Sequence, residues 1–307
     1  MSTSSTDNIC ANCGKGEESS GDLKACTACK LVKYCNRECQ IAHRPQHKRE
    51  CKKRAAELYD EQLFKENPPR EECPICMLPL PLVIMTNNGN SHTGTSFHSC
   101  CGKRICHGCI VAMSETGGKN MDLCAFCRTP KKKSNDEELQ RVNQLIEKGN
   151  AYAYFILGGY YDQGNCGLPQ DRAMANELFL KAGELGCAGA YYNLGGSYYE
   201  GMGVEIDKKK AMHFYELAAM NGDILARNNL GCLVGAAGND HRAMKHFLLA
   251  ARAGHNNAID LVKDGYMNGH VTKDQYADSL REYQKSQDEM KSDARDKALA
   301  YLNSMHG

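Results

Sequence analysis

The sequence predicts a mainly α-helical protein: two small cysteine-rich modules, irregular apart from short strands and helices, followed by an α-helical repeat solenoid. Three observations predict this fold class. Fifteen of the 18 cysteines lie between Cys10 and Cys127. The stretch Asn67-Pro68-Pro69-Arg70 divides these cysteines into two blocks, and proline cannot continue the helix expected over 52–65. Beyond residue 134 the chain repeats itself. We therefore expect three segments, 1–66, 67–133 and 134–307.

Composition restricts the function. The formal net charge of the 307 residues is +1, which speaks against nucleic acid or an anionic membrane as the partner. The basic run from His47 to Arg54 could be a nuclear signal, but a solvated helix face is the simpler interpretation. The residues Met1 to Asp7 are polar, and no apolar run reaches the roughly 20 residues of a membrane span. We expect an intracellular protein, cytoplasmic or nuclear or both.

The cysteines of the first block come in pairs with metal-ligand spacing. A reducing compartment favours metal ligation over disulfides, and each pair can present two ligands to one tetrahedral ion. A module this short buries little apolar surface, whereas a structural zinc contributes roughly 10–16 kcal/mol at neutral pH. The sequence therefore predicts two zinc sites here. Their eight ligands are Cys10, Cys13, Cys26, Cys29, Cys35, Cys39, His47 and Cys51.

This series, with Tyr34 before Cys35 and Lys48 after His47, resembles the MYND-type zinc finger. The resemblance implies an interleaved plan. One ion would be held by Cys10, Cys13, Cys35 and Cys39, and the other by Cys26, Cys29, His47 and Cys51. It also implies binding of short proline-containing peptides. The tryptophan that often helps to form the peptide groove in this family is replaced by Arg44.

The second block resembles a RING finger, through Cys73-Pro74-Ile75-Cys76, the Cys100 to Cys109 segment and Cys124-Ala125-Phe126-Cys127-Arg128. The resemblance implies a cross-braced module. Cys73, Cys76, Cys106 and Cys109 would hold one ion, and Cys101, Cys124 and Cys127 would contribute to the other. Lys103 stands where the family often has a histidine ligand, so the fourth ligand must come from Cys100 or His98, with Cys100 preferred. We expect four zinc ions, or three if this last site is degenerate.

The C-terminal segment contains a repeat of helix pairs. Four glycines recur at intervals of 37, 36 and 32 residues, and glycine suits the left-handed residue that ends a helix. They are Gly149, Gly186, Gly222 and Gly254. An Ala-rich helix precedes each of the last three, and we expect a terminal charged helix to cap the array. Helix pairs that cannot bury their apolar stripe alone stack into a solenoid. The pattern, clearest over 186–222, resembles the Sel-one-like repeat, a relative of the tetratricopeptide repeat, which implies an adaptor.

Two functions follow from these modules. The first is a zinc-binding adaptor or scaffold whose modules and solenoid recruit protein partners. The alternative is a RING-type ubiquitin-protein ligase that selects its substrate with the solenoid. The RING resemblance implies that Ile75 would contact a ubiquitin-conjugating enzyme and that Arg128 would orient ubiquitin. The sequence does not decide whether the protein is an enzyme, and it offers no catalytic residue. Four-ligand sites leave no open position for zinc-activated water.

Overall fold

The computed structural model describes residues 9–17, 22–82, 84–85, 91–92, 94–115 and 122–305. The polar residues 1–7 lie outside the described residues. The chain forms two compact units, Met1–Lys65 and Glu66–Gly307. It is mainly α-helical, with small cysteine-rich modules preceding a helical solenoid, so the predicted fold class is confirmed. Within the described part of the chain, each helix is either too short or too polar to cross a membrane.

The first unit is built from a short hairpin and one long helix. Strands β1 (Lys24–Ala25) and β2 (Lys33–Tyr34) pair antiparallel, and helix α2 follows over Arg37–Leu63. The Asn36 side chain caps α2 by accepting from the Cys39 N–H at 2.8 Å. The core of the unit consists largely of its cysteines, with Leu23 and Tyr34 packed among them.

Helix α2 begins much earlier than the sequence predicts. We expected a helix from residue 52, but α2 starts at Arg37 and continues through Pro45. The proline removes one backbone hydrogen bond and normally ends or kinks a helix. Three of the expected zinc ligands, Cys39, His47 and Cys51, lie on α2, so the metal-binding residues and the helix are one element.

The second unit opens with the RING-like module. Strands β3 (Ile84–Met85) and β4 (Ser91–His92) form one antiparallel pair. Strands β5 (Thr95–His98) and β6 (Lys103–Cys106) form another, with Thr95 opposite Cys106. Helix α3 (His107–Glu115) follows β6 directly. The module therefore consists of short strands and one helix around its cysteines.

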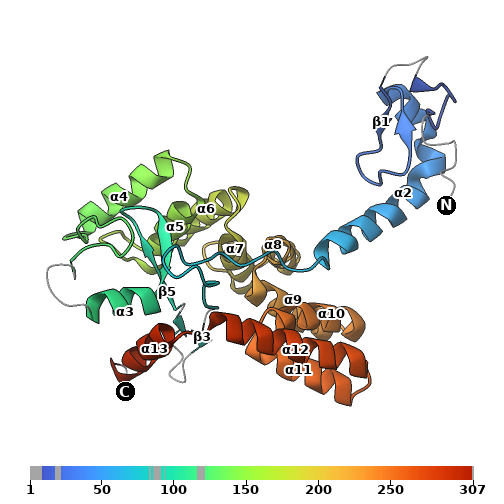
Figure 1. Cartoon of the computed structure of the whole chain (residues 1–307). Helices are drawn as coiled ribbons and strands as arrows, with labels where there is room; N and C mark the ends of the chain where they lie inside the picture. The colour runs from blue at the N-terminus through green and yellow to red at the C-terminus, as the bar shows by residue number, and fades with distance from the viewer. Residues whose placement is uncertain are drawn as a thin grey trace. The chain divides into compact units, whose positions relative to one another are not determined.

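The solenoid begins at Ser134, whose side chain caps the next helix by accepting from the Glu137 N–H at 3.1 Å. Glu137 accepts in turn from the Lys133 N–H, one residue before the cap. Antiparallel helices then stack in chain order (Figure 1). They are α4 (Asn135–Glu147), α5 (Ala151–Gln163), α6 (Arg172–Glu184), α7 (Ala188–Glu200), α8 (Lys208–Met220), α9 (Ile224–Ala236), α10 (Asp240–Arg252), α11 (Asn256–Met267) and α12 (Lys273–Met290).

The four periodic glycines all have positive φ and follow the ends of α4, α6, α8 and α10, as expected. The third repeat lacks the long loop of the first two. Residues 237–239 join its helices, where the earlier repeats use 164–171 and 201–207.

A glycine in the first helix of each repeat faces an aromatic ring of the second helix. A Cβ on Gly158 would lie 2.7 Å from the Phe179 ring, and one on Gly195 would lie 2.5 Å from the Tyr215 ring. Gly231 stands against Phe247 in the same way, at 2.4 Å. The close approach of the two helices in each pair therefore depends on a missing side chain at one repeated position.

The RING-like module contacts both ends of the solenoid. At the first end, the buried Glu138 of α4 accepts from Ser99 at 2.6 Å and from Tyr160 of α5 at 2.8 Å. At the other end, helix α13 (Asp293–Met305) turns away from α12 and packs beside α3 (Figure 1). We expected the terminal helix to cap the array. Instead, α12 packs on α10 and α11 at the end of the array, and α13 leaves the array and packs on the RING-like module.

Candidate metal centres

The eight expected ligands of the first module form two clusters. Helix α2 and the β1–β2 hairpin bring the ligands together in the interleaved order that the MYND resemblance implies. The Sγ atoms of Cys13 and Cys35 lie 3.7 Å apart, and those of Cys35 and Cys39 lie 3.5 Å apart. In the other cluster, Cys26 and Cys51 are 3.7 Å apart, and Cys29 Sγ lies 3.2 Å from His47 Nε2. Nε2 is thus the His47 atom turned toward the ligands.

The second module also forms two clusters. Cys73 and Cys109 Sγ atoms lie 3.8 Å apart, as do those of Cys76 and Cys106. These four residues are the third cluster, which the RING resemblance assigns to one ion.

The fourth cluster contains the ligand that the sequence left open. The structure brings Cys100 next to Cys127, with their Sγ atoms 3.4 Å apart, and Cys101 next to Cys124 at 4.0 Å. The alternative ligand, His98, ends strand β5, and its buried Nε2 has no hydrogen-bond partner among the described residues. The four-residue group that could hold a metal is Cys100, Cys101, Cys124 and Cys127. We propose Cys100 as the fourth ligand.

The spacing of these donors fits zinc. A tetrahedral ion with Zn–S bonds of about 2.3 Å separates its ligand sulfurs by about 3.8 Å. A disulfide would bring two sulfurs to about 2.05 Å. In each cluster the four ligand atoms lie within 4.8 Å of one another, and every cysteine is unbridged. Four ligands from the protein fill a tetrahedral shell, which is the arrangement of structural zinc sites.

The backbone around the clusters favours thiolates, the form that binds metal. Burial opposes the ionisation of Cys10, but backbone N–H groups, among them that of Cys13, lower the pKa of its thiol to about 6. Cys73 behaves alike, because backbone N–H groups of Cys106 and Cys76 outweigh its burial and lower its pKa to about 7. The turns that begin at Cys10, Cys26 and Cys73 therefore favour the thiolate form of their first cysteine.

A chain of aromatic side chains orients the histidine ligand. The His43 ring stacks on the His47 ring with centroids 5.7 Å apart, and the Tyr34 hydroxyl lies 3.1 Å from His43 Nδ1. Tyr34 is buried, so this arrangement holds His47 from within the core. This position of His43 was not predicted from the sequence. The four-residue spacing that places it one turn before His47 is the only signal available.

The two residues implied to contact a conjugating enzyme lie outside the clusters. Ile75 stands in the turn between Cys73 and Cys76 and is 41% exposed. Arg128 follows Cys127, is exposed, and its Nη1 lies 3.6 Å from the sulfur of Met113. Phe126, between the last two ligands, is 44% exposed. Substitutions at these positions would leave the ligands untouched.

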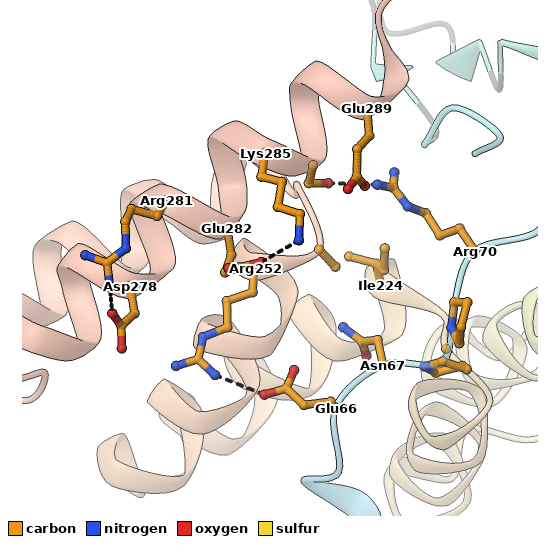
Figure 2. Close-up of a pocket in the computed structure, with 15 residues that line it drawn as sticks. Glu66, Asn67, Arg70, Ile224, Arg252, Asp278, Arg281, Glu282, Lys285 and Glu289 are labelled. Carbon is orange, nitrogen blue, oxygen red and sulfur yellow. Dashed lines mark hydrogen bonds and ion pairs between the residues drawn. The ribbon is translucent and has the colours of Figure 1, made fainter. Parts of the chain in front are cut away.

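The second unit also contains a cavity of about 610 Å³. It lies where the linker from Glu66 to Arg70 crosses α9, α10 and α12 (Figure 2). Its basic side chains already have partners. Arg252 pairs with Glu66 at 3.0 Å, and Arg70 donates to Ser286 at 2.8 Å. Two further ion pairs, Arg281–Asp278 and Lys285–Glu282, lie along α12. We interpret this cavity as the place where the linker is fastened to the solenoid.

The fold and the clusters together define a class: a zinc-finger protein that carries a helical-repeat solenoid. Comparison with known families then identifies two of its parts. Residues 10–51 are a MYND finger, which implies zinc binding. Residues 151–187, 188–223 and 224–255 are three Sel1 repeats. These matches confirm the MYND and Sel-one-like predictions.

Individual relatives overlap with parts of the chain. The ERAD-associated E3 ubiquitin-protein ligase component HRD3B of Arabidopsis thaliana is 38% identical over 101 residues, which are 32% of this chain. The chain spans only 15% of that relative. A Sel1 repeat protein from Oxalobacter formigenes is 27% identical, with a TM-score of 0.43 over 51% of this chain and 67% of that one. The immunity protein Pa5087 from Pseudomonas aeruginosa is 20% identical, with a TM-score of 0.35, over 58% and 64%.

Proposed function

We propose that this chain is a protein-interaction adaptor in which zinc-supported modules and the Sel1 solenoid recruit protein partners. The observation that carries the proposal is the combination of a MYND finger and Sel1 repeats in one chain. Each of the four clusters supplies four protein ligands, so the zinc it would hold has a structural role. Proline-containing peptides remain candidate ligands of the MYND finger, although Arg44 replaces the usual tryptophan.

Part of the solenoid surface is occupied by the chain itself. Pro68 packs against the turn at Gly222, and Asn67 contacts α9 and α10. The Phe97 ring packs against the Tyr152 ring in a tilted arrangement, with centroids 5.3 Å apart. A partner must therefore use another part of the surface. Helix α6 and its end present three partly exposed apolar side chains. They are Met174, Leu180 and Leu185, between 39% and 45% exposed.

The adaptor proposal predicts that this apolar surface of α6 binds a partner. Proteins cross-linked to the full chain in cells would be identified, produced in pure form and titrated against it. Replacing Leu180 by Asp should weaken binding at least tenfold, because the interface would then bury an unpaired carboxylate, and a loss of about 1.4 kcal/mol already corresponds to a factor of ten. Leu280→Asp on α12, where the side chain is likewise 41% exposed, is the matched control. If no purified partner binds the wild-type chain directly, the adaptor proposal fails.

The alternative function is a ubiquitin-protein ligase. It rests on the RING resemblance, which implies Ile75 and Arg128 for the enzyme and ubiquitin contacts, and both side chains are exposed. The name of the Arabidopsis relative refers to a component of such a ligase. A conjugating enzyme would then dock on the turns that carry these residues, and the solenoid would select the substrate.

The test of this alternative is discharge of ubiquitin from a panel of conjugating enzymes. Ile75→Ala should lower the affinity for the enzyme roughly ten- to a hundredfold, since it removes an apolar contact from a small interface. Arg128→Ala should slow discharge while docking is retained. Ile41→Ala in the MYND finger, where the side chain is 59% exposed, is the matched control. If the wild-type chain stimulates no member of the panel, the ligase alternative is excluded for that panel.

A further inference from the structure

The third cluster has a neighbour that the sequence analysis did not connect to it. Arg295 lies in the first turn of α13 and is only 8% exposed. Its Nη2 lies 3.5 Å from the Sγ of Cys76 and donates to the Leu78 carbonyl at 3.3 Å. Its Nη1 donates to the Pro79 carbonyl at 2.8 Å and to the Met290 carbonyl at 2.9 Å. The guanidinium therefore joins a ligand cysteine, the residues after it, and the end of α12.

The position of this cation is unusual for a helix. The N-terminal turn of a helix carries a partial positive charge, so a cation there is disfavoured and acidic residues are preferred. Something else must compensate for a buried arginine at this place. Four thiolates around one Zn²⁺ carry a net charge of −2. A buried charge is screened little by salt, so this negative charge would attract the Arg295 guanidinium, whose Nη2 lies 3.5 Å from Cys76 Sγ.

The ligand turn is shaped to admit the arginine. Gly108 lies between the ligands Cys106 and Cys109, at the start of α3. A Cβ at this position would lie 2.8 Å from Arg295 Cγ and 2.9 Å from the Arg295 backbone nitrogen. Any residue other than glycine would therefore push α13 away. The first turn of α13 packs directly on the turn that would hold the metal.

We propose that Arg295 is an outer-shell residue of a zinc site formed by Cys73, Cys76, Cys106 and Cys109, so that zinc binding and docking of α13 on α3 stabilise each other. Because coupling between two binding events is reciprocal, zinc holds the helix and the helix holds zinc. Removing an outer-shell partner typically lowers metal affinity 10- to 100-fold. This inference goes beyond the proposed adaptor function and does not depend on it.

The first experiment measures zinc retention in the full-length, zinc-loaded protein. Arg295→Met should make one zinc ion per chain transfer to a competing chelator at roughly 10- to 100-fold lower chelator concentration. Arg295→Lys, which keeps the charge but loses the forked contacts, should fall between this variant and the wild type. The matched control is Lys297→Met, which removes an exposed cation two residues after Arg295 on the same helix. This variant should retain zinc as well as the wild type does. Equal zinc retention in Arg295→Met and wild type would overturn the proposal.

The reverse experiment follows hydrogen exchange of the α13 backbone. Cys76→Ser, which removes a ligand of the third cluster, should expose the amides of 293–305, whereas Cys101→Ser in the fourth cluster should leave them protected. Protection of α13 in Cys76→Ser would contradict the coupling. Should Arg295→Met fail to fold, hydrogen exchange of the wild-type protein during zinc removal tests the same coupling. With increasing chelator, residues 73–80 and α13 must lose protection together, and separate transitions would refute the proposal.

Discussion

One asparagine of the linker connects two successive helices of the solenoid. The Asn67 side chain donates to the Leu249 carbonyl of α10 at 3.0 Å and accepts from Nε of Arg227 on α9. Arg227 is 1% exposed, and burial lowers the pKa of its guanidinium to about 10. It stays charged at neutral pH, and a buried charge requires its hydrogen bonds.

We expect Asn67→Ala to reduce the free energy of unfolding of the second unit by roughly 1–3 kcal/mol, because it removes a bond to a buried charged group. Urea denaturation at constant zinc concentration would measure the change. Asn143→Ala, at an exposed position of α4, is the matched control and should cost nothing. If Asn67→Ala is as stable as the wild type, this residue does not fasten the linker.

A second single residue predicts a pH dependence. Asp223 caps α9 by accepting from the Ala226 N–H at 2.8 Å. Burial raises the pKa of its carboxyl to about 6, although backbone N–H groups oppose the rise. The folded state therefore holds the proton more tightly than the unfolded state. The protonated Asp223 carboxyl therefore contributes fully to the stability of the fold below about pH 4, and this contribution is lost as the pH rises to about 6.

The Asp223→Asn side chain is neutral at every pH and can still cap the helix, so near pH 4 this variant should have the same free energy of unfolding as the wild type. At pH 7 its free energy of unfolding should be higher than that of the wild type by roughly 1–3 kcal/mol, since each pKa unit corresponds to about 1.4 kcal/mol. Comparing urea midpoints of the two proteins at each pH cancels the protonation of the zinc ligands, which they share. An advantage that shrinks with rising pH would show that the pKa is not raised.

At the scale of the element, two adjacent glycines of α7 should respond in opposite ways to the same change. A Cβ at Gly195 would lie 2.5 Å from the Tyr215 ring of α8, whereas one at Gly196 would meet only the Tyr215 hydroxyl, at 3.8 Å. Gly195→Ala should therefore destabilise the solenoid by about 1–3 kcal/mol through overpacking. Gly196→Ala should stabilise it by up to about 1 kcal/mol through helix propensity.

Thermal unfolding of the two variants, followed by circular dichroism, would separate these effects within one helix. The neighbouring substitutions serve as controls for each other, because both add the same methyl group. If Gly195→Ala melts at the same temperature as Gly196→Ala or higher, the close approach of α7 and α8 does not explain the repeated glycine.

The elements differ in how far they can be predicted from sequence. The solenoid helices follow from periodic glycines and small residues, because each repeat provides an independent copy of the same signal. Helix α2 could be predicted only from residue 52 onward, since Pro45 and the ligands inside it have poor helical character. The packing of α13 on α3 has no local signal, because it depends on Gly108 and Arg295, which are distant in sequence.

At the scale of the whole molecule, we predict four zinc ions in the intact chain by native mass spectrometry. His47→Ala should unfold the first unit and release both of its zinc ions, since that module has little core besides its cysteines. The second unit should keep its hydrogen-exchange protection, because the two units are separately compact. Two or fewer ions in the wild-type protein would refute the ligand assignment.

The ligands of the metal centres could largely be predicted from residue spacing, whereas the residues around the ligands could not. Pair spacing in the first block was enough to name all eight ligands, which the structure gathers into two clusters. The sequence could not choose between Cys100 and His98, because both lie within reach of Cys101 and only the path of β5 into the following turn separates them. The outer partners of the clusters, His43 and Arg295, come from tertiary packing.

The contact between α13 and the third cluster also affects how the protein is made. Arg295 lies 219 residues after Cys76. At roughly 5–20 residues per second, a ribosome needs on the order of 10–45 s to reach it. During this interval the nascent chain has its cysteine cluster but neither its arginine nor the helix that covers α3. A chain that stops at Met290 would remain in this state permanently, with an uncovered apolar helix face for chaperones and proteases to recognise.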